Sequence, residues 1–167
     1  PDIIMIGEIR DRETAEIAVQ ASLTGHLVLS TLHTNDAPSA ITRLVDMGVE
    51  PYLLSSTVIG VLAQRLVRRI CPECKSPYKP TERELMNLGL SVADLEEGHL
   101  YHGRGCAACF DSGFKGRLGI YELMIVNNDI KKQIVKSPDA IQLRQIAVDN
   151  GMITVLTHGS DLVRKGV

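Results

Sequence analysis

Near its start the chain reads Asp2-Ile3-Ile4-Met5-Ile6-Gly7-Glu8-Ile9-Arg10-Asp11, an apolar run that ends in a glycine and charged residues. A second apolar run, Leu27-Val28-Leu29-Ser30-Thr31-Leu32, lies further along. Continuous apolar runs of this length predict strands that are buried on both faces of a parallel sheet. Between the runs, Asp11 is a candidate N-cap for a helix over 12–22, and Gly25 is a candidate stop. Strand, helix and strand form a βαβ unit with a right-handed crossover, which predicts an α/β fold.

Charged side chains follow both predicted strands. Glu8 and Arg10 come after the first strand, and His33 comes after the second. Because open α/β sheets bind ligands beyond the carboxyl ends of their strands, we expect these three side chains at one edge. There a carboxylate can orient water, and the other two can contact phosphate oxygens. His26 precedes its strand and is expected at the opposite end. The alternative is that all four are ordinary surface side chains, with Arg10 paired to a neighbouring acidic residue.

The four cysteines form two CxxC pairs, Cys71-Pro72-Glu73-Cys74 and Cys106-Ala107-Ala108-Cys109. A two-residue gap lets both thiolates of a pair face one tetrahedral ion, and four thiolates leave no position for water. This pattern predicts a structural metal site, with zinc favoured by the spacing and by the softness of the ligands. Iron, two disulfides and two redox pairs are the alternatives. His99 and His102, just before the second pair, could each replace a cysteine, although four thiolates already close the site.

The segment between the cysteine pairs is long enough to have structure of its own. Thr81-Glu82-Arg83-Glu84 reads as a capping box that opens a helix over 81–88, and Gly89 would end it. Five of the six aromatic residues of the chain lie in or near this segment, and we expect their rings to form a small core. They are Tyr78, Tyr101, Phe110, Phe114 and Tyr121.

The remaining chain alternates helical and extended patterns. A helix opened by Pro38 is expected up to about Met47, and another from Pro51, whose apolar positions extend to Leu62. The segments 65–70 and 117–125 are expected to pair as antiparallel strands, with the segment that holds the four cysteines inserted between them. The C-terminal part is expected to be helical, with a helix around Ile130 and Ile134, a second one capped by Ser137-Pro138, and a third over 152–163. The sequence contains no internal repeat and no low-complexity segment.

Composition excludes several classes of protein. The chain has 167 residues, of which 44% are hydrophobic, 23% charged and 4% aromatic, with a net charge of −2. The composition is that of a globular protein, and no apolar run approaches the ~18 residues of a membrane span. The weak net charge and the few aromatic rings argue against direct nucleic-acid binding. No signal peptide precedes the first strand, and the opening at Pro1 leads us to expect a piece of a longer protein.

The motifs together resemble the secretion ATPase superfamily, in its GspE/PulE/PilB-like branch of type II secretion and type IV pilus assembly ATPases. The run 2–11 is similar to the atypical Walker B box of that family, in which Gly7 replaces the usual aspartate. The run 24–35, Thr24-Gly25-His26-Leu27-Val28-Leu29-Ser30-Thr31-Leu32-His33-Thr34-Asn35, is similar to its His box. The four cysteines match the tetracysteine site of the assembly branch, and 116–122 resembles the strand that closes the insertion.

The resemblance implies a fold and a division of the chain. It implies the C-terminal half of a RecA-like ATPase core over 1–70, made of a parallel βαβ unit and antiparallel strands. A tetracysteine zinc lobe would be inserted over 71–115, a closing strand would follow over 116–127, and a helical subdomain over 128–167.

The resemblance also implies a function. ATP and Mg²⁺ would be the cofactors of the intact ATPase, with Zn²⁺ as a structural ion. Glu8 would be the catalytic carboxylate that orients water, and His33 would contact the γ-phosphate. His26 and Arg10 would bind or support the nucleotide. Such ATPases form homo-hexamers in the cytoplasm, at the inner membrane, where they bind membrane-anchored assembly proteins.

The sequence departs from the family at one point. No glycine is followed by lysine, so the phosphate-binding P-loop is not within these residues. We therefore expect the chain alone to bind ATP weakly and to be inactive. Two other functions are considered: a non-catalytic, zinc-stabilised protein-interaction module, and a nucleic-acid-binding zinc protein such as a DNA-uptake component.

Overall fold

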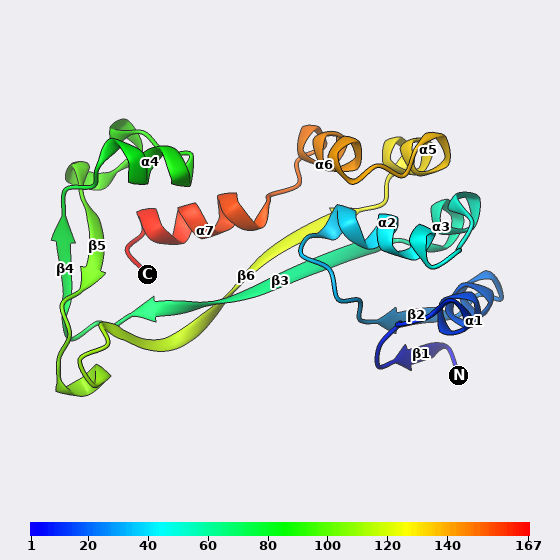
Figure 1. The fold of residues 1–167 in the computed structure, drawn as a ribbon, viewed down its shortest axis with the longest axis horizontal. Coiled ribbons are helices and arrows are strands. Elements are labelled where there is room, and N and C mark those ends of the chain that lie inside the picture. The colour runs from blue at the N-terminus through cyan, green and yellow to red at the C-terminus, as the bar shows by residue number, and fades with distance from the viewer. The chain divides into compact units, whose positions relative to one another are not determined.

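The computed structural model describes all of residues 1–167 and has an α/β fold with parallel and antiparallel strands (Figure 1). Its strands form three two-stranded sheets, which pair β1 with β2, β3 with β6, and β4 with β5. The chain divides into two compact units, 1–63 with 122–152 and 64–121 with 153–167, and each is described by itself below. No helix combines the length and the apolar character that crossing a membrane requires.

The first unit begins with the predicted βαβ arrangement. Its elements are β1 (Ile3–Ile6), α1 (Arg12–Leu23), β2 (Leu27–Ser30), α2 (Ala37–Asp46), α3 (Pro51–Thr57), α5 (Asn128–Lys136) and α6 (Ala140–Asp149). β1 and β2 are parallel, with Ile3 opposite Leu27 and Ile6 opposite Ser30. The carboxylate of Asp11 caps α1 by accepting a hydrogen bond from the backbone N–H of Thr14, as predicted.

The parallel sheet is covered on one face only. Ile6 and Val28 pack against a core formed by the helices, whereas Met5 is 79% exposed and Leu29 is 51% exposed. Successive side chains of a strand point to opposite faces, so each strand has one covered and one bare row. The prediction of strands buried on both faces was therefore wrong. An apolar run shows that a strand can be buried, but it does not show how many layers pack against it.

The helix expected from Pro51 to Leu62 is shorter than predicted. α3 ends at Thr57, Val58 is already extended, and β3 (Gly60–Ile70) begins three residues after the helix ends. Several β-branched residues follow one another here, and side chains along the first part of β3 alternate between exposed and half-buried. Both features favour a strand, and they outweigh the helical spacing of Val61 and Leu62.

The antiparallel pair expected on either side of the metal lobe is present, and both strands are longer than predicted. β3 pairs with β6 (Phe114–Ile125). The backbone N–H of Val126 donates to the carbonyl of Ile59 at 3.1 Å, and that of Cys71 donates to the carbonyl of Gly113 at 3.0 Å. One end of β3 therefore meets the far end of β6, which is the antiparallel arrangement.

The second unit holds the metal lobe. It contains β4 (Lys75–Tyr78), α4 (Glu82–Leu88), β5 (Leu100–Gly103) and α7 (Val155–Arg164), with single helical turns at Val92–Asp94, Glu96–Gly98 and Ala107–Cys109. The capping box at the start of α4 is present: Thr81 and Glu84 exchange hydrogen bonds, and Gly89 ends the helix with a left-handed φ of 64°. The third C-terminal helix was also predicted, and its Ser160 hydroxyl donates to the carbonyl of Leu88 at 2.6 Å.

The core of this unit differs from the prediction. Leu85, Leu95 and Leu100 form it, with the partly buried Tyr78 packed against them, whereas Phe110 is 93% exposed. Other rings contact cations instead: the Arg68 guanidinium lies 4.0 Å from the centre of the Phe114 ring. The prediction of a core built from all five rings was therefore wrong: Tyr78 joins the core, whereas the Phe114 and Tyr101 rings lie beside the cationic side chains of Arg68 and Lys75.

The start of α6 is also displaced from its predicted cap. Asp139, not Ser137-Pro138, is the N-cap, and its carboxylate accepts a hydrogen bond from the backbone N–H of Gln142 at 2.9 Å. An aspartate accepts this bond well, whereas proline has no side-chain acceptor. Within the first unit, α6 packs against α2 and α5.

Candidate functional site

The carboxylate of Glu8 lies at the end of β1 and contacts a guanidinium and an imidazole. Arg10 Nε and His33 Nε2 both contact its oxygens. The Glu8 side chain is 18% exposed, whereas those of Arg10 and His33 are 77% and 85% exposed. The structure thus brings together the three side chains that the strand order placed at one edge. The partner of Arg10 is Glu8 rather than a neighbouring residue of α1.

Two backbone contacts from the second strand fix the position of Glu8. The Thr31 hydroxyl donates to the carbonyl of Gly7 at 2.7 Å, and the backbone N–H of Ile9 donates to the carbonyl of Thr31 at 3.0 Å. One residue therefore holds the chain on both sides of Glu8. Thr31 was not among the site residues predicted from the sequence. The available signal was a hydroxyl residue directly after the second strand, opposite the carboxylate of the first.

This arrangement has a definite chemical capacity. A carboxylate that is 18% exposed lies beside an imidazole and a guanidinium that are both largely exposed. A carboxylate so placed can accept a hydrogen bond from an attacking water or from the water shell of a divalent cation. The guanidinium and the imidazole can donate to phosphate oxygens. The group therefore suits phosphoryl-transfer chemistry at the sheet edge.

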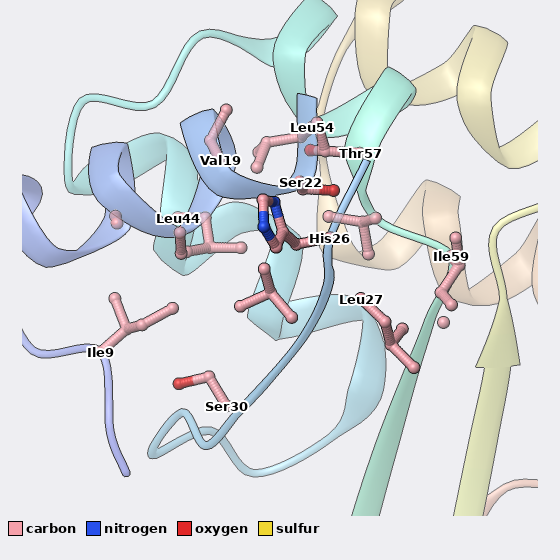
Figure 2. A pocket seen from close by; sticks show the side chains of 15 residues that line it. Ile9, Val19, Ser22, His26, Leu27, Ser30, Leu44, Leu54, Thr57 and Ile59 are labelled. Carbon is pink, nitrogen blue, oxygen red and sulfur yellow. The ribbon is translucent and has the colours of Figure 1, made fainter. Parts of the chain in front are cut away.

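His26 lies elsewhere in the first unit. It precedes β2, so the parallel pairing places it at the amino ends of the strands, as predicted. Its Nδ1 lies 3.1 Å from the Thr24 hydroxyl and 3.1 Å from the carbonyl of Ala21. The side chain borders a mostly apolar cavity of about 200 Å³, between α1, α3 and the start of β3 (Figure 2). The structure does not bring His26 to Glu8.

The four cysteines converge on one point of the second unit. All four sulfurs lie within 4.8 Å of one another. Cys71 Sγ is 3.9 Å from Cys106 Sγ, and Cys74 Sγ is 3.9 Å from Cys109 Sγ. Metal–sulfur bonds of 2.3 Å in a tetrahedron would separate the sulfurs by about 3.8 Å, whereas a disulfide requires about 2.05 Å. The four thiols are free, and their geometry suits a single tetrahedral ion.

The thiols differ in their local electrostatics. Burial raises the pKa of Cys74 to about 12. Burial also acts on Cys109, but backbone N–H groups of Cys106 and Gly113 donate to its sulfur and lower its pKa to about 7. Hydrogen bonds of this kind favour a thiolate. A cation at the centre of the four sulfurs would favour the thiolate form of all of them, which is the form that binds metal.

The sequence matches the family described as Type II/IV secretion system protein over residues 1–167. The chain belongs to this family. It is 61% identical over 167 residues to type II secretion system protein E of Pseudomonas aeruginosa, which covers all of this chain and 33% of that protein. It is 52% identical over 167 residues to the type IV pilus assembly ATPase PilB of Thermus thermophilus, covering all of this chain and 19% of that protein.

Solved structures of two ATPases have a similar fold. The crystal structure of the pilus retraction motor PilT with bound ADP matches with a TM-score of 0.64 at 28% identity, over 99% of this chain and 36% of that one. The Legionella pneumophila ATPase DotB matches with a TM-score of 0.65 at 20% identity, over 100% of this chain and 36% of that one, which is a likeness of fold alone. The chain thus spans about a third or less of the length of these relatives.

Proposed function

We propose that this chain is the part of a secretion or pilus-assembly ATPase that begins at the Walker B box. The carrying observation is the contact of Glu8 with Arg10 and His33 at the end of β1. Family membership over the whole chain and relatives that are named as ATPases support the proposal. The division implied by the sequence, with a half-core, a metal lobe, a closing strand and a helical subdomain, is part of it.

Within that ATPase, the residues at the carboxyl ends of β1 and β2 take distinct roles. ATP and Mg²⁺ supply the phosphoryl group and the cation that neutralises its charge. Glu8 orients the attacking water. The hydrogen bond from the Thr31 hydroxyl to the carbonyl of Gly7 holds the backbone beside Glu8. His33 and Arg10 donate to phosphate oxygens from the exposed side. The assignment of His26 to nucleotide binding rests on the His box alone, since its side chain lies away from the other three.

Other parts of the proposed ATPase, including its P-loop, lie outside these residues. The phosphate-binding P-loop is not part of this sequence, so the chain needs further residues of the ATPase to hold the nucleotide. We propose a homo-hexamer that works in the cytoplasm beside the inner membrane and binds membrane-anchored assembly proteins. Direct nucleic-acid binding forms no part of the proposal. Zn²⁺ is the ion proposed for the four cysteines, because four soft ligands in a closed tetrahedron favour it.

The test is Glu8→Gln in the full-length gene product that carries this chain. The amide keeps the shape of the side chain but loses its charge, so we expect hydrolysis to fall at least about a hundredfold. The dissociation constant for ATP should stay within about twofold. Glu16→Gln is the matched control, because Glu16 also pairs with an arginine, at 2.7 Å from Arg12, but lies on the surface of α1.

A second function is favoured by a separate observation, the tetrahedral cluster of four cysteines. It describes the chain as a zinc-stabilised protein-interaction module without catalysis. Full hydrolysis in the Glu8→Gln variant would remove Glu8 from catalysis. A full-length protein that neither binds nor hydrolyses ATP would favour the interaction module.

A further inference from the structure

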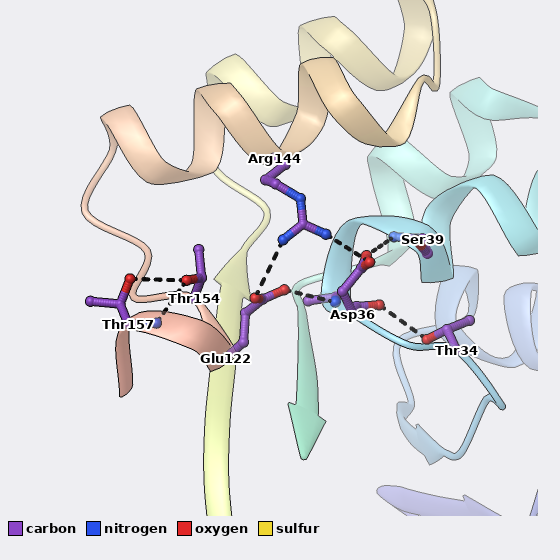
Figure 3. A network of polar contacts seen from close by, with 8 residues as sticks. Thr34, Asp36, Ser39, Glu122, Arg144, Thr154 and Thr157 are labelled. Atoms are coloured by element: carbon purple, nitrogen blue, oxygen red, sulfur yellow. Dashed lines mark hydrogen bonds and ion pairs between the residues drawn. The ribbon is translucent and has the colours of Figure 1, made fainter. Parts of the chain in front are cut away.

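A buried carboxylate in β6 has no role in the site described so far. Glu122 is 1% exposed, and its Oε1 accepts a hydrogen bond from the backbone N–H of Ala37 at 3.0 Å. Arg144 of α6 bridges two acidic residues: its Nη1 lies 3.8 Å from Glu122 Oε2, and its Nη2 lies 2.7 Å from Asp36 Oδ2 (Figure 3). The network therefore joins β6, α6 and the first turn of α2.

The buried Glu122 carboxylate is both paired with an arginine and hydrogen-bonded. Removing a carboxylate from water is costly unless it is paired and hydrogen-bonded, and replacing buried ion pairs by apolar residues often leaves stability unchanged. The position at the N-terminus of α2 also favours a negative charge. Such a network therefore suits a role in fixing geometry more than a role in stability alone.

The network ends on the segment that carries His33. Asp36 is the N-cap of α2, with its Oδ1 accepting from the backbone N–H of Ser39 at 2.9 Å. The Thr34 hydroxyl donates to the carbonyl of Asp36 at 3.1 Å. At the other end of the segment, Thr31 is bound to the backbone on both sides of Glu8. His33 thus lies in a short segment with two fixed ends.

We propose that Glu122 and Arg144 are positioning residues for His33. They hold Asp36 and the start of α2, and thereby fix the carboxyl end of the segment from which His33 reaches the Glu8 carboxylate. Neither residue touches the site itself. The inference rests on the proposed function, because His33 matters only if the edge acts on a nucleotide.

The experiment uses Arg144→Met and Glu122→Gln in the full-length protein. Methionine keeps much of the arginine's apolar volume, and glutamine keeps an oxygen that can accept from Ala37. We expect kcat for ATP hydrolysis to fall about tenfold in each variant, because small displacements of a catalytic group are costly. KM for ATP should stay within about twofold. Arg144→Lys should recover only part of kcat, because an ammonium cannot bridge two carboxylates as the guanidinium fork does.

A second comparison separates positioning from general stability. If the network acts through His33, Arg144→Met should lower kcat about tenfold in the natural background and less than about twofold in a His33→Ala background. The matched control is Arg164→Met, because Arg164 pairs with Asp161 at 3.2 Å and its side chain is 43% exposed, against 39% for Arg144. This control should leave kcat unchanged.

Each outcome has a distinct meaning. Equal losses in the two backgrounds, or no loss in either, would overturn the positioning role while leaving Glu8 as the catalytic carboxylate. Loss of thermal stability with full kcat below the melting temperature would also overturn it. Failure of the natural protein to hydrolyse ATP, or full activity of Glu8→Gln, would instead remove the proposed function.

Discussion

If the four cysteines bind the proposed ion, removing it should unfold residues 71–113 and leave the first unit folded. The lobe has only three buried apolar side chains away from the cysteines, Leu85, Leu95 and Leu100. At about 1.5–3 kcal/mol for each, they contribute roughly 5–9 kcal/mol. Structural zinc binding contributes about 10–16 kcal/mol in small metal domains. The ion is therefore expected to supply the larger share of the stability of the lobe.

Amide hydrogen exchange measures this loss residue by residue. With a strong chelator, exchange in β4 and β5 should accelerate at least about a thousandfold, which corresponds to ~4 kcal/mol. Exchange in α5 should not change, because Ile130 and Ile134 are 0% exposed in the separate core of the first unit. Cys74→Ser should reproduce the effect of the chelator. Ala108→Ser is the control, since it adds a hydroxyl within the second cysteine pair and removes no sulfur.

Unchanged exchange in β4 and β5 after complete removal of the metal would refute the reasoning. It would mean that the three leucines and the backbone hydrogen bonds suffice. Elemental analysis of the purified protein identifies the ion and should find one zinc per chain. Iron in its place would keep the structural role and correct the identity of the metal.

Three further predictions concern single residues. Thr31→Val removes the hydroxyl that donates to Gly7, a bond worth about 1 kcal/mol, and should lower kcat severalfold, whereas Thr31→Ser should not. Burial raises the pKa of Asp36, but hydrogen bonds from Ser39 and the charge of Arg144 outweigh it and lower the pKa below 3.8. The resulting stability exists above the unfolded pKa of about 3.9 and is lost as pH falls through the folded value, so Asp36→Asn should lower Tm at pH 7 and differ less from the natural protein below about pH 4. Ile130→Ala should cost about 2–5 kcal/mol in urea unfolding, because Ile130 is fully buried, while Ile141→Ala, at 79% exposure, should cost less than about 0.5 kcal/mol.

Features that depend on neighbours in the sequence could be predicted from it. The capping box between Thr81 and Glu84 joins residues three positions apart, and the two cysteine pairs reveal a tetrahedral site by their spacing. The meeting of Glu8 with His33 needed one further step, the rule that parallel strands align their carboxyl ends. In each case the physical rule acts over a short segment or a single βαβ unit.

Which face of a strand is buried could not be predicted from neighbouring residues in the sequence. The alternate rows of β1 are equally apolar, yet Ile6 packs against the core and Met5 is 79% exposed. Nothing within four residues distinguishes the two rows, because burial depends on which other segments pack against the sheet. The same reason explains Phe110, a large apolar side chain whose position in a tight left-handed turn leaves it in solvent.

The Glu122 network shows where a signal was present and where it ended. Within β6 and just after it, Ile120, Met124 and Val126 are buried at alternate positions, and Glu122 occupies the same row. A lone carboxylate on an otherwise apolar face requires a partner, since an unpaired buried charge is too costly to keep. The pattern of one strand therefore predicts that a cation or a helix N-terminus meets Glu122. It does not predict which one, because Ala37 lies 85 residues away in the sequence and many arginines could reach such a site. The choice of Arg144 follows only from the packing of α6 against α2, and that packing is what gives a residue remote from Glu8 an influence on His33.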